Sequence, residues 1–413
     1  MVFTTSIGGY MDTNDFLGSF AQENVAFTTR IVKTASVGDN FWKVMIFVEN
    51  DRFVDAKDAS WVAVPGSSTT KALTVTGSST GSSTIKALTV TANDYAEYTS
   101  GLLRSWLYDL FCNGFTGDCI LVACADKVDS DPSGFISAME NAYGLMKAYA
   151  YHKTCCVCAG DSADVTAIIP EVGVSLASLC AEDKGLLSSA PYFQYSTSTP
   201  EQTDTDSLYT AIKNSGKDAF FAAHQDATRN AALYSLGLAM STLNGSGTCV
   251  GNSFDMVKSS YITCSGPGGT NLSQSTRRLL ESLNIQTFKP IGDNSGSVAA
   301  IGASTINEDV VQATWILAYV TYMTKVAVAQ LITTNNFLKN ANSYSRILSV
   351  MSSYLTKFGA SGSGRLENMQ ITAPAFGSID SKADQIIIPD AWSATYVDQV
   401  RKVQITGTLY IGV

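Results

Sequence analysis

The chain has few histidines, few prolines and few charged side chains for its length. Its 413 residues include 2 His and 9 Pro, and Asp, Glu, Lys and Arg together make up 15%. Scarce proline combined with 45% hydrophobic residues excludes a disordered or collagen-like chain. The length indicates a globular protein of several structural units. Because charges are few, the surface must be largely neutral and polar, which suits extensive contact with other protein.

Positive charge is the scarcer sign. The chain carries 27 Lys and Arg against 36 Asp and Glu, a formal net charge of −9 at pH 7. A protein that neutralises phosphates needs the opposite sign, so we expect no nucleic-acid partner.

Long hydrophobic runs are also missing. Residues 1–20 contain no Lys or Arg and no continuous apolar block, which predicts no secretory signal peptide and synthesis in the cytosol. The longest apolar stretch, Val310–Ile332, is interrupted by Gln312, Lys325 and Gln330. We therefore predict no membrane insertion.

With two histidines, a catalytic imidazole can only be His152 or His224. His224 follows the apolar segment Asp218–Ala223 and precedes Gln225-Asp226, a strand-to-helix turn where α/β enzymes carry catalytic groups. We favour a polar turn that caps the next helix, because no GxSxG nucleophile motif is present. The prediction is that the chain is not an enzyme, and a cytosolic α/β enzyme using His224 is the less favoured alternative.

Metal and nucleotide sites are not expected either. Cys155, Cys156 and Cys158, with His152 before them, resemble a soft-metal cluster. Adjacent cysteines on a strand point to opposite faces, so a buried strand explains them better than a metal. The Gly-rich loop Ser265–Thr270 has no lysine at the position a phosphate-binding loop requires. We expect no cofactor.

Periodicity divides the chain into four parts. Residues 1–24 form an N-terminal arm, 25–290 an α/β region, 291–398 a C-terminal domain, and 399–413 a C-terminal strand arm. The predicted fold class is mixed α/β (α+β), with a mixed sheet covered by helices and extended strand arms at both ends. The expected strands are 41–48, 119–124, 154–158, 218–223, 366–371 and 385–388, and the expected helices are 93–110, 135–149, 230–243, 273–283, 308–331 and one containing Ile347–Leu355.

An internal duplication occupies residues 67–91. Ser67–Thr76 reads SSTTKALTVT and Ser82–Thr91 reads SSTIKALTVT, identical at nine of ten positions. Each copy follows Gly and Ser and ends in alternating Leu-Thr-Val-Thr, which predicts two strands joined by a polar turn. Two copies are too few for a solenoid.

The last segment alternates apolar and polar residues to the end of the sequence. Val403, Ile405, Leu409 and Ile411 share one face of the strand that this pattern predicts. Chain ends fray unless they are tied down, so we expect a sheet to capture this strand, in its own subunit or in a neighbour. Donation of the strand to a neighbour would build a polymer.

The terminal passage and one earlier passage resemble a known family. A helical region, then Trp392, then the segment YVDQVRKVQITGTLYIGV is similar to the C-terminal part of myovirus-type contractile tail sheath proteins of bacteriophages. Asn93–Asp118, in which a Leu-Thr-Val strand leads to a helix and a Phe111-Cys112-Asn113-Gly114 turn, is similar to another passage of that family. Together these motifs cover less than half of the chain.

The resemblance implies a structural subunit that forms hexameric rings, stacked helically around a tail tube. Its partners would be further copies of itself, the tail tube protein, and baseplate and tail terminator proteins. Neighbouring subunits would exchange strand arms, with Val403, Ile405, Leu409 and Ile411 as anchors, and contraction would drive the tube through the host envelope. The resemblance implies no cofactor, assembly in the host cytoplasm and a place in the virion tail. Another self-assembling virion protein, of a capsid or tube, is the alternative.

Nine cysteines are many for a protein made in a reducing compartment, and an odd number excludes complete pairing within one chain. A particle released by lysis enters an oxidising medium, where thiols of adjacent subunits can pair. We therefore predict inter-subunit disulfide bonds, with Cys112, Cys119, Cys155, Cys156, Cys158, Cys180, Cys249 and Cys264 as the candidates.

Overall fold

The structure is a computed structural model. It describes residues 44–49, 72–76, 84–99, 101–117, 119–124, 131–146, 154–157, 169–182, 190–195, 207–226, 228–241, 255, 257–291, 297–334, 340–378 and 391–397. The two expected arms, 1–24 and 399–413, and the expected strand 385–388 lie outside these residues.

The first sheet is mixed and has the strand order β2-β3-β4-β1-β5. Its strands are β1 (Val44–Glu49), β2 (Ala72–Thr76), β3 (Thr84–Val90), β4 (Cys119–Cys124) and β5 (Thr154–Val157). β4, β1 and β5 run parallel, while β3 and β2 continue the sheet antiparallel. The duplicated segment therefore forms two paired strands, as predicted.

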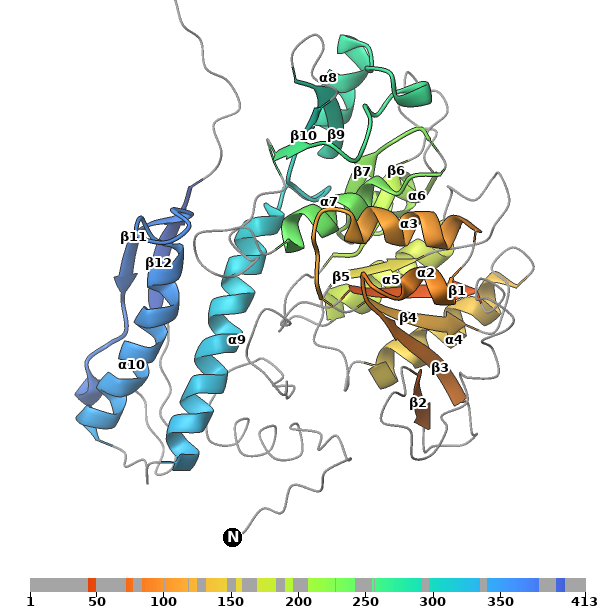
Figure 1. Ribbon diagram of the computed structural model, residues 1–413. Helices are drawn as coiled ribbons and strands as arrows, with labels where there is room; N and C mark the ends of the chain where they lie inside the picture. Colours follow the sequence, from red (N-terminus) through yellow and green to blue (C-terminus); the bar gives the residue numbers. More distant parts are fainter. Residues whose placement is uncertain are drawn as a thin grey trace, which may run out of the picture.

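The second sheet has the order β6-β7-β9-β10-β8. Its strands are β6 (Tyr192–Tyr195), β7 (Phe220–Ala223), β8 (Val257–Ser259), β9 (Ile285–Pro290) and β10 (Val298–Ile301). β6, β7 and β9 run parallel to one another. β10 is antiparallel to β9, and β8 is antiparallel to β10. The edge strands β5 and β6 lie beside each other, so the two sheets follow one another through the centre of the molecule (Figure 1).

Helices cover both faces of these sheets, as the α/β prediction required. α3 (Gly101–Phe111) and α7 (Ala231–Met240) pack on one face, and α4 (Pro132–Met146), α5 (Pro170–Glu182) and α6 (Ser207–Asn214) on the other. Successive side chains of β1 point to opposite faces of the sheet and belong to two different hydrophobic cores. Val44, Ile46 and Val48 belong to the first core, and Met45 and Phe47 to the second.

The single helix expected over 93–110 is two helices. A short α2 (Tyr95–Tyr98) ends where Thr99 is extended, and α3 begins at Gly101, whose φ is 56°. Only glycine adopts this left-handed conformation without strain, so the chain turns there. The cap is also different from expectation, because the Asp94 carboxylate accepts the N–H of Thr91 at 2.7 Å and does not cap α2.

α3 and α7 approach each other very closely at Gly237. A Cβ atom at this position would lie 1.9 Å from the carbonyl oxygen of Leu110. No side chain larger than hydrogen fits there, so the glycine sets the distance between the two helices.

The C-terminal part consists of α9 (Val311–Thr334), α10 (Ala341–Leu355), β11 (Leu366–Ile371) and β12 (Trp392–Tyr396). α9 begins three residues later than expected, because residues 305–309 form a turn in which Thr305 N–H bonds to Asp309 O and Glu308 has a φ of 70°. The remaining elements are α8 (Gln274–Ser282) and the 3-10 turns Pro267–Gly269, Thr356–Phe358 and Phe376–Ser378. No helix in the described ranges is both long and apolar enough to cross a membrane.

Candidate assembly site

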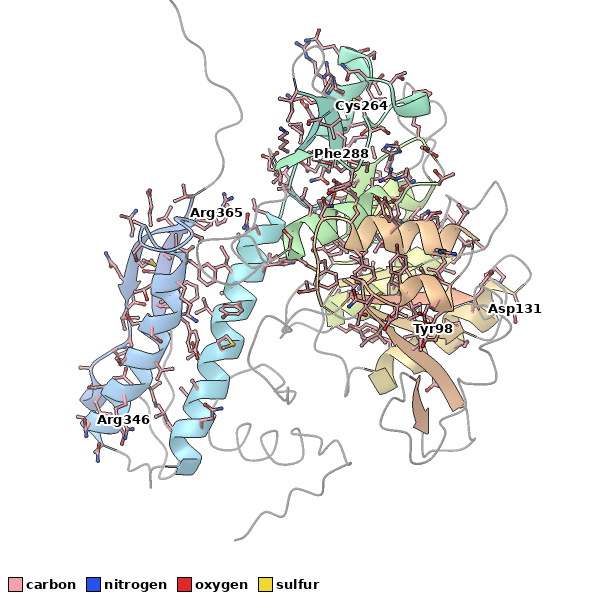
Figure 2. All side chains as sticks on the ribbon, viewed as in Figure 1. Tyr98, Asp131, Cys264, Phe288, Arg346 and Arg365 are labelled. Atoms are coloured by element: carbon pink, nitrogen blue, oxygen red, sulfur yellow. The ribbon has the colours of Figure 1, made fainter. Side chains whose placement is uncertain are left out.

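α9 and α10 lie side by side, and the small sheet β11–β12 lies beside α10 (Figure 1). Asn340 caps α10, since its side-chain oxygen accepts the N–H of Ser343 at 2.9 Å. The buried face of α10 carries Tyr344, Ile347, Met351 and Leu355. In Figure 2, Arg346 on α10 and Arg365 before β11 mark the two ends of this unit.

β11 and β12 form an antiparallel pair with a bulge. Leu366 and Glu367 lie opposite Tyr396 and Thr395, and pairing resumes at Gln370 opposite Ser393, so two residues of β11 face one residue of β12. Asn368 supplies the bulge with a φ of 51°, a left-handed conformation that Asn tolerates better than most residues. The extra residue brings Leu366 and Met369 to the same face of the pair.

One face of the small sheet is packed and the other is open. Buried Leu366 and partly buried Met369, Trp392, Ala394 and Tyr396 pack against the first core. On the opposite face, Glu367, Gln370, Ser393 and Thr395 are exposed. The polar face is suited to solvent or to a polar partner.

The small sheet has two strands among the described residues, and no third strand of these residues pairs with β11 or β12. A two-stranded ribbon is marginally stable alone, and the outer edge of a ribbon can accept another strand.

Side-chain hydrogen bonds fix the sheet on its helical support. The hydroxyl of Tyr396 donates to Oε1 of Gln312 on α9 at 3.3 Å, and that of Tyr344 on α10 donates to the carbonyl oxygen of Pro374 at 2.6 Å. Val397 donates its N–H to the carbonyl oxygen of Arg365 at 2.9 Å, which continues the ladder one residue beyond β12. The terminal segment starts from this ladder.

The predicted arm anchors Val403, Ile405, Leu409 and Ile411 lie outside the described residues, and their role stays a prediction. The pairing that forms the small sheet was not predicted. The strand Leu366–Ile371 was predicted with these bounds, but its partner β12 was not, because WSATY has no long apolar run.

The cysteines are spread over several elements. Cys112 is half-buried, Cys264 and Cys180 are buried, and all three are free thiols. Cys119 and Cys124 are buried at the two ends of β4. Cys155 and Cys156 belong to β5, as the strand interpretation required, and Cys158 and Cys249 lie outside the described residues. Disulfide bonds between subunits remain a prediction for all eight candidates.

Burial affects the reactivity of these thiols. It raises the pKa of Cys112 to about 12, with a smaller contribution from the neighbouring Asp109, and it also raises the pKa of Cys264. The thiolate is the reactive form, so Cys112 reacts slowly near neutral pH in this conformation.

His224 is fully buried at the end of β7. Its Nδ1 accepts the N–H of Asp226 at 3.1 Å, and its Nε2 lies 3.2 Å from the hydroxyl of Thr263. Burial lowers the pKa of His224, which keeps the ring neutral. Both ring nitrogens thus hold a turn in place, an arrangement that favours the structural interpretation of this residue over the catalytic one.

A buried polar cluster surrounds the start of α7. Asp109 of α3 is fully buried and lies 2.5 Å from the guanidinium of Arg229. Its second oxygen accepts the N–H of Asn230 at 2.7 Å, and Asn230 caps α7 by accepting the N–H of Leu233. Burial raises the pKa of Asp109 to about 6, although Arg229 opposes the rise. This cluster locks α3 to α7 and was not predicted, because its residues are 120 positions apart.

No cluster of potential metal ligands occurs among the described residues. The Gly-rich loop forms a 3-10 turn at Pro267–Gly269, closed by a hydrogen bond from Gly266 N–H to Thr270 O at 2.9 Å. It lies near Cys264, which Figure 2 shows close to Phe288 of the second sheet.

Comparison with known proteins identified a solved structure with a similar fold. No protein-family description matches the chain, and no curated protein matches it. A chain in the cryo-EM structure of the anti-feeding prophage (AFP) baseplate, 6-fold symmetrised, is similar in structure at a TM-score of 0.58 and 14% sequence identity. The match covers 99% of this chain and 100% of that one, so the two share a fold over their whole length.

Proposed function

We propose that the chain is a structural subunit of a phage-type contractile tail sheath. It polymerises as hexameric rings around a tail tube through strand-exchanging arms, and contraction drives the tube through the host envelope. The observation that carries the proposal is the small sheet β11–β12, whose outer edges have no partner strand among the described residues and which precedes the alternating segment at the end of the sequence.

Strand exchange between subunits accounts for both the small sheet β11–β12 and the alternating segment at the end of the sequence. A single terminal strand can fill at most one of the two outer edges of β11–β12 in its own subunit. The arm of a neighbour adds main-chain hydrogen bonds, and Val403, Ile405, Leu409 and Ile411 set its register through their shared face. Each subunit then both donates and accepts a strand, which links subunits without end.

The architecture is compatible with large rigid-body motion. The small sheet rests on α9 and α10, whose buried residues belong to the same core as α3, α7 and one face of the two larger sheets (Figure 1). In this proposal the subunits rotate as rigid bodies while the exchanged strands stay paired. No cofactor is part of the proposal.

The structural match supports a tail-like assembly and favours a second candidate. The similar chain belongs to a particle's baseplate, so a baseplate subunit that makes the same kind of contact without forming a long tube is the alternative. Its partners would be other baseplate proteins. When purified alone, such a subunit forms a ring or does not assemble, whereas a sheath subunit forms tubes.

Negative-stain electron microscopy of the purified protein separates these functions. We expect tubes or stacked rings from the full chain. Val403→Asp, or deletion of Leu409–Val413, should leave a folded monomer without tubes, because a charge or a gap enters the apolar face of the donated strand. Thr406→Asp, on the polar face, is the matched control and should still form tubes.

Three results would redirect the proposal. Tubes from the truncated chain would exclude the arm as the link. Single rings at all concentrations would favour the baseplate subunit. Small particles, together with a turnover activity that His224→Ala abolishes, would favour the enzyme.

A further inference from the structure

Three helices on one face of the sheets border a surface groove with an acidic rim. α4, α5 and α6 line this groove, which has a volume of about 640 Å³. Its floor includes the partly buried apolar residues Val174 and Leu179. The charged residues among its described lining are all glutamates: Glu140, Glu171 and Glu182. The groove therefore suits a helix that carries positive charge on its surface.

Glu171 and Glu182 lie on the same face of α5, eleven positions apart. Eleven residues make three helical turns, so the two carboxylates are separated by about 16 Å along the helix axis. Between them lie two short side chains, Ser175 and Ser178. The hydroxyl of Ser175 donates to Oε1 of Glu140 at 2.9 Å, and that of Ser178 donates to a backbone carbonyl oxygen of its own helix at 2.9 Å. Both serines are thus hydrogen-bonded within the molecule and let a neighbouring helix approach closely.

α10 presents a face with the complementary pattern. On the side away from its buried residues, Arg346, Ser349, Ser353 and Lys357 are exposed. Lys357 lies in the 3-10 turn that continues α10, and its ammonium is 4.9 Å from the centre of the Tyr354 ring. Arg346 and Lys357 are also eleven positions apart, and α10 contains no acidic residue. The positive charges of this face therefore match the eleven-residue spacing of the two glutamates on α5.

We propose that the exposed face of α10 docks in the α4–α5–α6 groove of a second copy of this chain. The equal spacing lets both positive residues of α10 pair with Glu171 and Glu182 at the same time when the two helices lie along each other. Exposed ion pairs contribute little affinity, so they select the register, and the apolar floor of the groove adds the remaining attraction. The contact is therefore weak for a single pair of subunits and sensitive to salt.

The contact joins different surfaces of the two copies. In Figure 1, α9 lies between α10 and the helices α4 and α5, so α10 does not lie near the groove of its own subunit. A contact between two different surfaces is head-to-tail, and it can repeat from one subunit to the next. It uses neither the terminal arm nor the strand edges of β11–β12, so it does not depend on the proposed function.

Zero-length cross-linking with a carbodiimide tests the contact on the full chain. An equal mixture of unlabelled and isotopically labelled protein is treated with the reagent, which joins an amine to a carboxylate only when the two are in contact. We expect mass spectrometry to find Lys357 of one copy joined to Glu171 or Glu182 of the other. Lys357→Arg keeps the charge but has no reactive amine, so the link should disappear. Absence of a mixed-isotope link in the full chain, or links only within one copy, would overturn the proposal.

A charge reversal at the other end of α10 tests the pairing without changing the linked residues. Arg346→Glu replaces an attraction by a repulsion, so we expect the yield of the Lys357 link to fall by about tenfold. Arg278→Glu, on the exposed surface of α8, is the matched control, because it changes the net charge equally and should leave the yield unchanged. Equal yields from the two variants, whether high or low, would contradict the proposal.

Two double variants test whether the contact can be restored and give the direction of the helices. If the helices run parallel, Arg346 pairs with Glu171, and Arg346→Glu combined with Glu171→Lys should recover the link. If they run antiparallel, Arg346 pairs with Glu182, and Arg346→Glu combined with Glu182→Lys should recover it. We expect one of the two double variants to regain the yield of the wild type, and recovery in neither would overturn the proposal.

Discussion

Trp315 of α9 donates its indole N–H to the hydroxyl of Tyr192 on β6 at 3.1 Å, and both side chains are fully buried. This bond joins the helix that carries the small sheet to the second sheet of the main body.

Substitution at this junction should weaken the attachment of α9. Trp315→Phe and Tyr192→Phe each remove the hydrogen bond, and we expect each to lower the free energy of unfolding by about 1–3 kcal/mol, the range for loss of a buried partner. Urea denaturation of the two single variants and the double variant measures their coupling. A coupling of zero would show that the bond contributes nothing to stability.

The crossing of α3 and α7 should not tolerate a methyl group. In Gly237→Ala the new Cβ collides with the backbone carbonyl of Leu110, so we expect a loss of about 3 kcal/mol, typical of overpacking. Gly377→Ala is the control, because its Cβ would have no neighbour within 4 Å. Thermal unfolding of both variants, followed by circular dichroism, checks the prediction, which equal melting temperatures would contradict.

Asp109 should make the protein more stable as the pH falls. Burial raises its pKa from the usual 3.8 to about 6 in the folded chain, so the folded state takes up the proton first. The contribution of this group to the free energy of unfolding therefore rises as the pH drops through 6 toward 3.8, each pKa unit being worth about 1.4 kcal/mol. Urea unfolding of the wild type and of Asp109→Asn at several pH values measures the difference between them. A difference that does not change with pH would contradict the prediction.

His224, in contrast to Asp109, should make the protein less stable as the pH falls. Burial lowers its pKa below the usual 6.5, so the folded state binds the proton less tightly than the unfolded one. Its stabilising contribution is complete above pH 6.5 and is lost as the pH falls through the lower folded pKa. His224→Asn keeps an acceptor near the N–H of Asp226 but cannot titrate, so its stability should depend less on pH in this range. A slope as steep as that of the wild type would assign the dependence to other groups.

Cys112 should be alkylated slowly despite being only half-buried. Its raised pKa leaves very little thiolate near neutral pH. Mass spectrometry after treatment with N-ethylmaleimide should show much slower labelling of Cys112 in the folded chain than in the chain unfolded by urea. Equal rates would mean that the thiol is accessible and ionised, and Cys112 would then be the first candidate for a disulfide between subunits.

Local patterns in the sequence predicted most of the elements. Apolar runs identified β4, β7 and β11, and helical spacing identified α4, α7, α9 and α10, because one buried face imposes a period on each element. The break between α2 and α3 was not predicted, because the left-handed conformation of Gly101 leaves no mark on the hydrophobic pattern. Nor did the sequence indicate that β12 pairs with β11.

The sequence alone determined the α/β class and the near-identity of the two repeated strands, since periodicity and repetition are local properties. The bond between Trp315 and Tyr192, the ion pair of Asp109 with Arg229 and the contact of Gly237 with Leu110 were decided only by the tertiary structure. Each joins residues more than 100 positions apart, and no local pattern encodes which distant residues meet when two elements pack. The register in which β2 pairs with β3, with Ala72 opposite Leu88, also belongs to the fold, because no local pattern selects it.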